Sequence, residues 1–442
     1  MAVADSLAAV EVASMPAPMV YAFGSNGSGQ LGIGHVEDVA RPERCVFRTW
    51  MRAPGGGGVD QGTDRGGKVA QVLNVRKIVA GGTHTLVLTT GGRLFIAGKT
   101  RMRIPYESYL DVGRSIDSES ESEREKCTVV FQEITHHVVS STVASSERDV
   151  VVTDVAATWE ASFAVVDSKI IVGWGSGTKG ELGLGPGIIS TEGKVKKIFE
   201  VDSDSSHGEA VKVEIVDIVG SMAHVVVLAS DGRVYGWGSC RKGQLGQQLK
   251  TEKILWSPRN IAGGLGVDDG EDLLLLPWTP QKVVAGREYT VFVKIGRQPV
   301  IWGDTRFFDI QDSEELMVVE EGDVVTSGWS SIHVLSQRRS EQSLLQGVGR
   351  NSHGQLPPAS LPPLRTVAAG SEHCVALSRD NQGIAWGWGE HGNCGDTLDQ
   401  RGNVVDRYNV VPLPTLDDDE IVPKDVAAGC ATSFIIYGKK DG

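Results

Sequence analysis

Cysteine is scarce in this sequence, and its spacing excludes two common kinds of site. The chain has six cysteines in 442 residues, and no two form a C-x-x-C pair. Neither a disulfide framework nor a thiolate zinc site fits such scattered positions. We therefore expect free thiols in a reducing compartment, with no metal site and no cofactor. The cysteines are Cys45, Cys127, Cys240, Cys374, Cys394 and Cys430.

An excess of basic charge and a long apolar run are missing as well. The formal net charge is −13, which disfavours direct, sequence-independent binding to nucleic acid or to an anionic membrane. No stretch reaches the roughly 18 apolar residues of a membrane helix. The first nineteen residues lack a basic region and contain Asp5 and Glu11. We interpret residues 1–19 as a disordered lead-in, because a signal peptide begins with basic residues.

Glycine, in contrast, is abundant, and it marks a repeat. The chain has 55 glycines, which indicates many turns. Four segments share an aromatic or apolar residue followed by G-x-x-x-x-G-[QE]-L. They are "FGSNGSGQLG" from Phe23, "WGSGTKGELG" from Trp174, "WGSCRKGQLG" from Trp237 and "VGRNSHGQLP" from Val348.

A second element precedes most of these segments and has the form G-x-x-[HYST]-x-x-x-[LVI]. Examples are "AGGTHTLVL" from Ala80 and "AGSEHCVAL" from Ala369. Between the two elements lie hairpin turns such as "SDGRVYGWG" from Ser230. Each unit is therefore a set of short strands that cannot bury its own faces, so neighbouring units must stack, and a closed ring leaves few open edges.

The units number seven if the two chain ends are joined. Six whole units lie at about 75–100, 151–183, 216–246, 281–304, 323–356 and 364–395. The chain begins with the second half of a unit and ends with the first half of one. We predict an all-β protein, a seven-bladed β-propeller closed by pairing of its N- and C-terminal strands. It occupies residues 20–442 as one domain, with solvated loop insertions at 48–70 and 101–149.

The stretch "GWGEHGNCGD", residues 387–396, looks most like a chemical site. We expect Trp388 to fill the repeat's aromatic core position, ahead of a loop shorter than the others. Glu390, His391 and Asn393 then remain in a glycine-bracketed turn. A structural turn, a contact with a partner, and a metal or catalytic site are the three alternatives. No second histidine or cysteine lies at ligand spacing, which disfavours the third.

Among the other histidines and tryptophans, some are expected to pack inside the fold and others to contact a partner at the surface. His84 and His373 share one repeat position, which favours a packing role. Trp159, Trp329 and His333 belong to less regular units, and we expect Trp159 and Trp329 to be exposed. The candidate partner-binding residues are Glu390, His391, Asn393, Trp329, His333 and Trp159. No paired carboxylates, triad or metal cluster indicates a catalytic residue, so we do not predict an enzyme.

The repeat resembles that of the regulator of chromosome condensation family, over roughly Val20 to Tyr437 apart from the insertions. Within this family, "YAFGSNGSGQLGIGHVED" at 21–38, "WSSIHV" at 329–334 and "GWGEHGNCG" at 387–395 resemble one branch. This branch comprises the fungal alpha-tubulin suppressor proteins, also called killer-toxin-insensitivity proteins.

The resemblance implies a cytoplasmic and nuclear protein that forms a heterodimer with the small CSL-type zinc protein of diphthamide synthesis. Such a pair supports diphthamide formation on elongation factor two. It also supports Elongator-dependent modification of wobble uridines in tRNA, so Elongator and the diphthamide enzymes are expected as indirect partners. The alternative is a guanine-nucleotide exchange factor or a chromatin-associated propeller, as elsewhere in the family. The net charge argues against the chromatin role.

Overall fold

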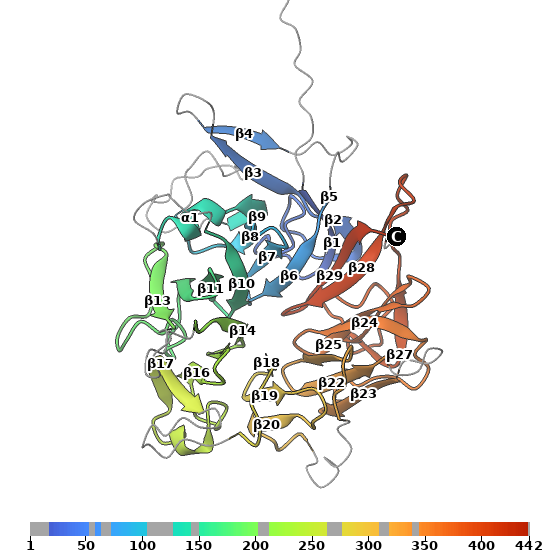
Figure 1. Cartoon of the computed structure of the whole chain (residues 1–442). Helices are drawn as coiled ribbons and strands as arrows, with labels where there is room; N and C mark the ends of the chain where they lie inside the picture. Colours follow the sequence, from blue (N-terminus) through green and yellow to red (C-terminus); the bar gives the residue numbers. More distant parts are fainter. Residues whose placement is uncertain are drawn as a thin grey trace, which may run out of the picture.

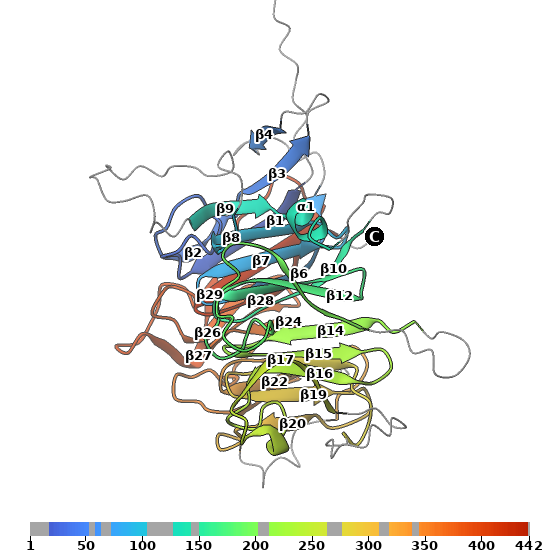
Figure 2. The same ribbon diagram turned by 90° about the vertical axis from the view of Figure 1, so that its left-hand side faces the viewer.

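The computed structural model is a ring of seven antiparallel sheets, which confirms the predicted seven-bladed β-propeller (Figure 1). In the edge-on view, the strands run across the thickness of the ring (Figure 2). The structure describes residues 17–52, 58–62, 72–103, 127–142, 150–201, 212–262, 276–308, 318–337 and 344–440. Within these ranges no helix is long and apolar enough to cross a membrane.

The blades are numbered in chain order, and each begins with its innermost strand. Blade 1 contains β6 (Val75–Ala80), β7 (His84–Thr89), β8 (Leu94–Lys99) and β9 (Cys127–Glu133). Blade 2 contains β10 (Val152–Ala157), β11 (Ala161–Val166), β12 (Ile170–Gly175) and β13 (Lys196–Glu200). Blade 3 contains β14 (Ile215–Gly220), β15 (His224–Ala229), β16 (Val234–Ser239) and β17 (Ile254–Ala262). Blade 4 contains β18 (Lys282–Ala285), β19 (Tyr289–Val293) and β20 (Val300–Gly303). Blade 5 contains β21 (Val324–Ser327), β22 (Ser331–Ser336) and β23 (Leu344–Gly349). Blade 6 contains β24 (Leu364–Ala369), β25 (His373–Ser378), β26 (Gly383–Trp388) and β27 (Asn403–Val411).

Blade 7 closes the ring with strands from both ends of the chain, as predicted. It contains β28 (Ile421–Ala428), β29 (Thr432–Lys439), β1 (Ala17–Gly24) and β2 (Val39–Arg44). Strand β1 pairs antiparallel with β29, from Met19 opposite Tyr437 to Gly24 opposite Thr432. All eight residues of β1 are buried.

Several boundaries that we expected for the lead-in and for the loop insertions were wrong. Residues 17–19 belong to β1 and not to a lead-in, while residues 1–16 lie outside the described residues. The expected insertion at 48–70 overlaps β3 (Phe47–Arg52) and β4 (Gly58–Gly62), which pair with each other. Strand β3 also pairs with β9 and so extends the sheet of blade 1. A two-residue strand, β5 (Val72–Leu73), pairs in parallel with β1.

The expected insertion at 101–149 likewise contains regular structure. It holds β9, the fourth strand of blade 1, and the five-residue helix α1 (Thr135–Val139). The serine-rich part of this insertion, residues 104–126, lies outside the described residues, as do residues 143–149. The only other described helix is the 3₁₀ turn η2 (Gln247–Leu249) in blade 3.

The second strands form the middle of the core because each is covered on both faces by neighbouring blades. Strands β7, β11, β15, β22 and β25 are buried at every position. Their sequences are correspondingly near-continuous apolar runs, such as "HVVVLA" in β15. Side chains in phase on the third strands fill the spaces between blades, where Phe23, Trp174, Trp237 and Trp386 are 0% exposed.

Each third strand has a glycine, at its last or next-to-last position, that touches the turn between the first two strands of its blade. Gly238 has φ +98°, and a Cβ there would lie 2.4 Å from the Ala223 carbonyl oxygen. Only glycine fits because a side chain would overlap that oxygen and would strain the backbone. The same close approach recurs in every blade, at Gly24, Gly98, Gly175, Gly303, Gly349 and Gly387.

The strand directions place two kinds of loop on one face of the ring. Successive strands in a blade are antiparallel, so the turn after the first strand and the loop after the third lie at the same end. We call this face the turn face. The repeat glycines, which lie in these turns and loops, therefore identify the segments of the sequence that form the turn face.

The loop after each third strand also joins its blade to the next blade. The residue after the second repeat glycine offers its backbone carbonyl to a side chain of the following blade. The four bonds are Trp237 Nε1 to Glu181 (2.7 Å), Thr290 Oγ1 to Gln244 (2.8 Å), Trp386 Nε1 to Gln355 (3.2 Å) and Ser433 Oγ to Asn393 (2.9 Å). The second half of the repeat motif, around its second glycine, therefore joins neighbouring blades.

Buried histidines near the turn face make further contacts between or within blades. His224 Nε2 lies 3.1 Å from Thr290 Oγ1, and His373 Nε2 lies 3.0 Å from Ser433 Oγ, in each case in the next blade. His84 occupies the same strand position in blade 1, in agreement with the packing role predicted for it. Burial lowers the pKa of His84, His224, His333 and His373 from 6.5 to about 4.

These four histidines should make the fold sensitive to mild acid. Their pKa values are lower in the folded chain than in the unfolded chain, so their contribution to stability is complete above pH 6.5 and is lost as the pH falls toward 4. We expect a loss of about 2 kcal/mol for each histidine between pH 7.5 and pH 5. Urea unfolding at the two pH values measures it. His224→Gln should reduce the pH dependence by about one histidine's share, and a pH-independent free energy of unfolding would contradict the prediction.

Removing the closing strand should destabilise the whole ring. Deleting residues 432–442 removes β29, including Phe434, which is 0% exposed, and leaves β1 and β28 as open edges. We expect a large drop in the thermal unfolding midpoint, or loss of cooperative unfolding, in circular dichroism. A synthetic peptide of residues 421–440, added to a chain that ends before β28, should restore part of the stability. An unchanged midpoint after the deletion would show that pairing at the ends is dispensable.

Candidate functional site

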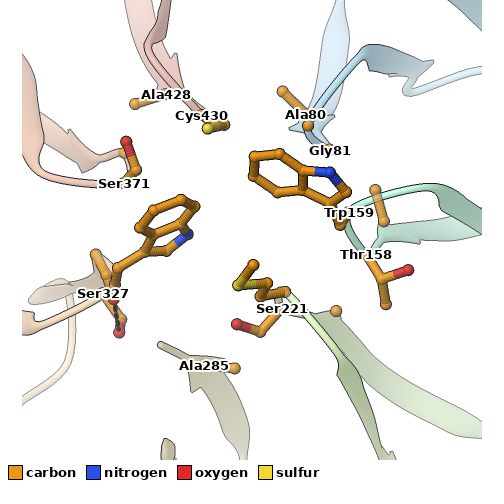
Figure 3. Close-up of a pocket in the computed structure, with 18 of the residues that line it drawn as sticks. Ala80, Gly81, Thr158, Trp159, Ser221, Ala285, Ser327, Ser371, Ala428 and Cys430 are labelled. Carbon is orange, nitrogen blue, oxygen red and sulfur yellow. Dashed lines mark hydrogen bonds between the residues drawn. The ribbon is translucent and has the colours of Figure 1, made fainter. Parts of the chain in front are cut away.

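The turns between first and second strands form a ring around the central opening of the turn face. All seven blades contribute, and they enclose a cavity of about 130 Å³ (Figure 3). Most turns have alanine or glycine at their first two positions, so the third position decides what fills the opening. The third residues are Gly82, Trp159, Met222, Arg287, Trp329, Ser371 and Cys430.

Backbone hydrogen bonds hold these turns to one another. The Gly82 N–H donates to the Trp159 carbonyl (2.9 Å), and the Trp159 N–H donates to the Met222 carbonyl (3.3 Å). On the other side of the ring, the Trp329 N–H donates to the Ser371 carbonyl (2.8 Å). Because backbone bonds of this kind join the turns of blades 1 to 3 and those of blades 4 to 7, the side chains at the third positions are presented from a rigid frame.

Two tryptophans from different sides of the ring meet over this opening. The indole rings of Trp159, from blade 2, and Trp329, from blade 5, have centroids 5.9 Å apart at an angle of 44°. Figure 3 shows Trp159 reaching into the middle of the ring. Gly82 makes room for it, since a Cβ at Gly82 would lie 2.6 Å from the Trp159 ring. Both side chains are partly buried, so the pair combines a fixed position with accessible aromatic surface.

Glu390 and His391 lie on the turn face too, but in the loop after the third strand of blade 6. Glu390 is exposed, and the His391 side chain is 39% exposed. His391 Nδ1 lies 2.8 Å from Asp38 Oδ2 in blade 7, and its ring meets that of Trp388 edge to face at 5.3 Å. His391 therefore links two blades and keeps part of its ring accessible.

The loop of residues 387–396 is not shortened, which corrects our interpretation of the sequence. Trp386, opposite Cys374, occupies the core position of Trp237, opposite Val225, so Trp388 does not fill it. The error came from the doubled "WGWG", which offers two registers for the motif. In the register of the structure, Gly387 and Gly392 are spaced like Gly238 and Gly243.

His391 also has an equivalent in the repeat. His353 of blade 5 stands at the same position before the second glycine, and its Nδ1 lies 3.3 Å from Asn403 Oδ1 in blade 6. Both histidines therefore reach the following blade. Asn393 in turn matches Gln355, the residue after the second glycine. The 387–396 stretch is thus an ordinary copy of the repeat with a particular set of exposed side chains.

Two of the six candidate residues are fully enclosed. Asn393 is 0% exposed, and its Nδ2 donates to the Trp388 carbonyl at 2.7 Å. His333 is 0% exposed, with Nε2 3.0 Å from Ser331 Oγ. Neither side chain can contact a partner on the surface of this fold. The structure therefore leaves Trp159 and Trp329 at the centre of the turn face and Glu390 and His391 in a peripheral loop.

The sequence analysis did not identify Met222, Ser371 and Cys430 as residues that line the cavity. Aligning all seven turns on the first strand would have found them, because they share the position of Trp159 and Trp329. Cys430 is partly buried, and burial raises its pKa to about 11. Among the described residues, no group of three or more histidine, cysteine, aspartate or glutamate side chains could hold a metal ion.

Comparison with known proteins identifies the repeat. Residues 231–293 match the model of the regulator of chromosome condensation (RCC1) repeat. An RCC1 repeat-containing protein of Schizosaccharomyces pombe is 24% identical over 430 residues, covering 95% of this chain and 98% of that protein. The mouse secretion-regulating guanine nucleotide exchange factor is 22% identical over 426 residues, which cover 86% of this chain and 76% of that protein. The guanine nucleotide exchange factor SRM1 of Saccharomyces cerevisiae is 24% identical over 308 residues, which cover 60% of this chain and 61% of that protein.

Solved structures agree with the fold. Prp20p of Saccharomyces cerevisiae superposes with a TM-score of 0.60 at 17% identity, covering 97% of this chain and 93% of that one. Human WBSCR16 superposes with a TM-score of 0.59 at 16% identity, covering 96% of this chain and 100% of that one. The chain is thus a seven-bladed β-propeller in which residues 231–293 match the RCC1 repeat.

Proposed function

We propose that this propeller is a non-enzymatic binding protein that holds a partner protein against its turn face. One observation carries the proposal: Trp159 and Trp329 meet, partly exposed, at the centre of a ring of hydrogen-bonded turns. Tryptophan is enriched among the few residues that supply most of the binding energy at protein interfaces, and such residues cluster near the interface centre. A rigid frame also lowers the entropic cost of binding because the aromatic rings are already in place.

The partner that we propose is the small CSL-type zinc protein. The three stretches that resemble the alpha-tubulin suppressor branch, 21–38, 329–334 and 387–395, belong to blades 7, 5 and 6, which are consecutive around the ring. The His391–Asp38 contact joins two of the stretches. In this function the chain forms a heterodimer in the cytoplasm and nucleus. It supports diphthamide synthesis and, with Elongator, wobble-uridine modification.

A second candidate is guanine-nucleotide exchange on a small GTPase. The names of two relatives favour it, since the mouse protein and SRM1 are both called guanine nucleotide exchange factors. Prp20p was described together with its binding to Gsp1p and histones. The net charge of −13 argues against a chromatin role that requires direct contact with DNA.

Binding measurements with purified proteins separate the two functions. The chain is titrated calorimetrically with the CSL-type zinc protein, and release of labelled GDP from a small GTPase is followed in parallel. We expect tight binding of the zinc protein and no acceleration of GDP release. Accelerated release without zinc-protein binding would replace the first function with the second.

Substitutions on the turn face test where the partner binds. Trp159→Ala should weaken zinc-protein binding by about ten- to a hundred-fold, since a central tryptophan contributes more than about 1.4 kcal/mol. Replacing Glu390 and His391 together with alanine should weaken it by up to about ten-fold because both lie in a peripheral loop. Lys212→Ala is the control, since its side chain is 76% exposed and precedes β14 at the opposite end of the blade. If the folded Trp159→Ala variant binds as tightly as wild type, the opening is not the interface.

A further inference from the structure

Two arginines on the turn face lie over aromatic rings on either side of one turn. The Arg287 guanidinium carbon is 5.6 Å from the centroid of the Trp329 ring. The Arg350 guanidinium carbon is 4.0 Å from the centroid of the Phe307 ring. We call Arg287, Trp329, Phe307 and Arg350 the arginine strip. Its residues come from blades 4 and 5 only.

The backbone holds the two pairs side by side. The Arg287 N–H donates to the Trp329 carbonyl (3.1 Å), and the Arg350 N–H donates to the carbonyl of the next residue, Ser330 (2.9 Å). Two consecutive carbonyls of a single turn therefore fix the positions of both arginines. Since this turn is also bonded to the turn of blade 6, through the Trp329 N–H and the Ser371 carbonyl, the strip is held by the same rigid frame.

Both arginines are available to a ligand. Arg287 and Arg350 are exposed, and among the described residues no carboxylate pairs with either of them. The neighbouring Arg306 differs, because it is bonded to Asp304 (2.5 Å between Nη2 and Oδ2). That bond lowers the pKa of Asp304 to about 2. The Asp304–Arg306 pair therefore cancels its own charge, and Arg287 and Arg350 leave a net positive strip on an acidic protein.

This arrangement suits carboxylates that flank an apolar side chain. A guanidinium stacked on a ring covers the ring face but keeps its N–H edge free for a bidentate bond to a carboxylate. The partly exposed Trp329 and the Phe307 side chain, 37% exposed, offer apolar surface between the two charges. Tryptophan and arginine are also the residues most enriched at interface hot spots.

We propose that the arginine strip binds an acidic segment of a partner protein, with one carboxylate on each arginine and an apolar residue between them. A nucleic acid is a poorer match because phosphate binding needs many basic side chains along a groove, and this strip has two. The proposal goes beyond the function assigned above, since it names residues and a ligand chemistry that do not depend on which partner occupies the turn face.

A defined peptide tests the proposal without a known partner. A fluorescein-labelled peptide with the sequence Glu-Asp-Leu-Asp-Glu is titrated with the purified chain, and fluorescence anisotropy gives the dissociation constant at low and at physiological salt. We expect binding that weakens with salt, and that falls at least about ten-fold in the double variant Arg287→Glu/Arg350→Glu. A peptide with Gln and Asn in place of Glu and Asp should bind at least about ten-fold more weakly.

The control variant, Arg41→Glu/Lys212→Glu, makes the same charge change at two exposed positions outside the strip. It should bind the acidic peptide within about two-fold of wild type once general charge effects are screened by salt. Circular dichroism checks that both variants fold. No detectable binding, equal loss in the two variants, or unchanged binding in Arg287→Glu/Arg350→Glu would each overturn the proposal. Tighter binding of a single-stranded oligonucleotide that needs the same arginines would also overturn it, in favour of a nucleic-acid site.

Discussion

The turn face depends on one close contact, in which the third strand of every blade passes against the turn between the first two strands. At Gly238 a Cβ would lie 2.4 Å from the Ala223 carbonyl, and at Gly387 a Cβ would lie 2.7 Å from the Glu372 carbonyl. A positive φ at this glycine then directs the following loop toward the next blade. There the loop after Gly238 accepts a hydrogen bond from Thr290 Oγ1, and the loop after Gly387 accepts one from Ser433 Oγ. Replacing such a glycine would disturb a blade and its neighbour together.

This contact also limits where the protein can vary its surface. The first two residues of each turn are packed against neighbouring backbone; a Cβ at Gly81, for example, would lie 2.5 Å from the Thr158 carbonyl. The third residue is less restricted by the backbone and ranges from Gly82 to Trp159, although the Trp159 ring leaves no room for a side chain at Gly82 itself. Seven copies of one frame thus place seven different third residues, six of them with side chains, at the turn face. A binding surface can change there without changing the fold.

The sequence was enough to predict the architecture because the repeat glycines, the hairpin turns and the split seventh unit all report backbone constraints. It placed Trp159 and Trp329 in the right turns but could not show that they touch, since they lie in different blades and their separation depends on ring curvature. It could not choose between Trp386 and Trp388, because "WGWG" satisfies the motif in two registers. Only the pairing of Trp386 with Cys374 decides between them.

The burial of individual polar side chains was a second feature that the sequence could not predict. His333 and Asn393 look like surface polar groups in the sequence, but the next blade covers His333, and Asn393 closes its own loop. The fourth strands were also missed, because β9 is separated from β8 by more than twenty residues of polar sequence. Neither feature has a local sequence signal, since each depends on packing between distant parts of the chain.

The shared seventh blade has a consequence for the order of folding. Strands β1 and β2 are synthesised first, but β1 gains its partner β29 only when almost all of the chain has left the ribosome. At the usual speed of translation, this delay is on the order of tens of seconds. During that time β1, which is buried at all eight positions in the finished ring, has no native neighbour on that side. The nascent chain therefore carries an unpaired apolar strand, a segment that chaperones bind and that aggregates when it is left unprotected.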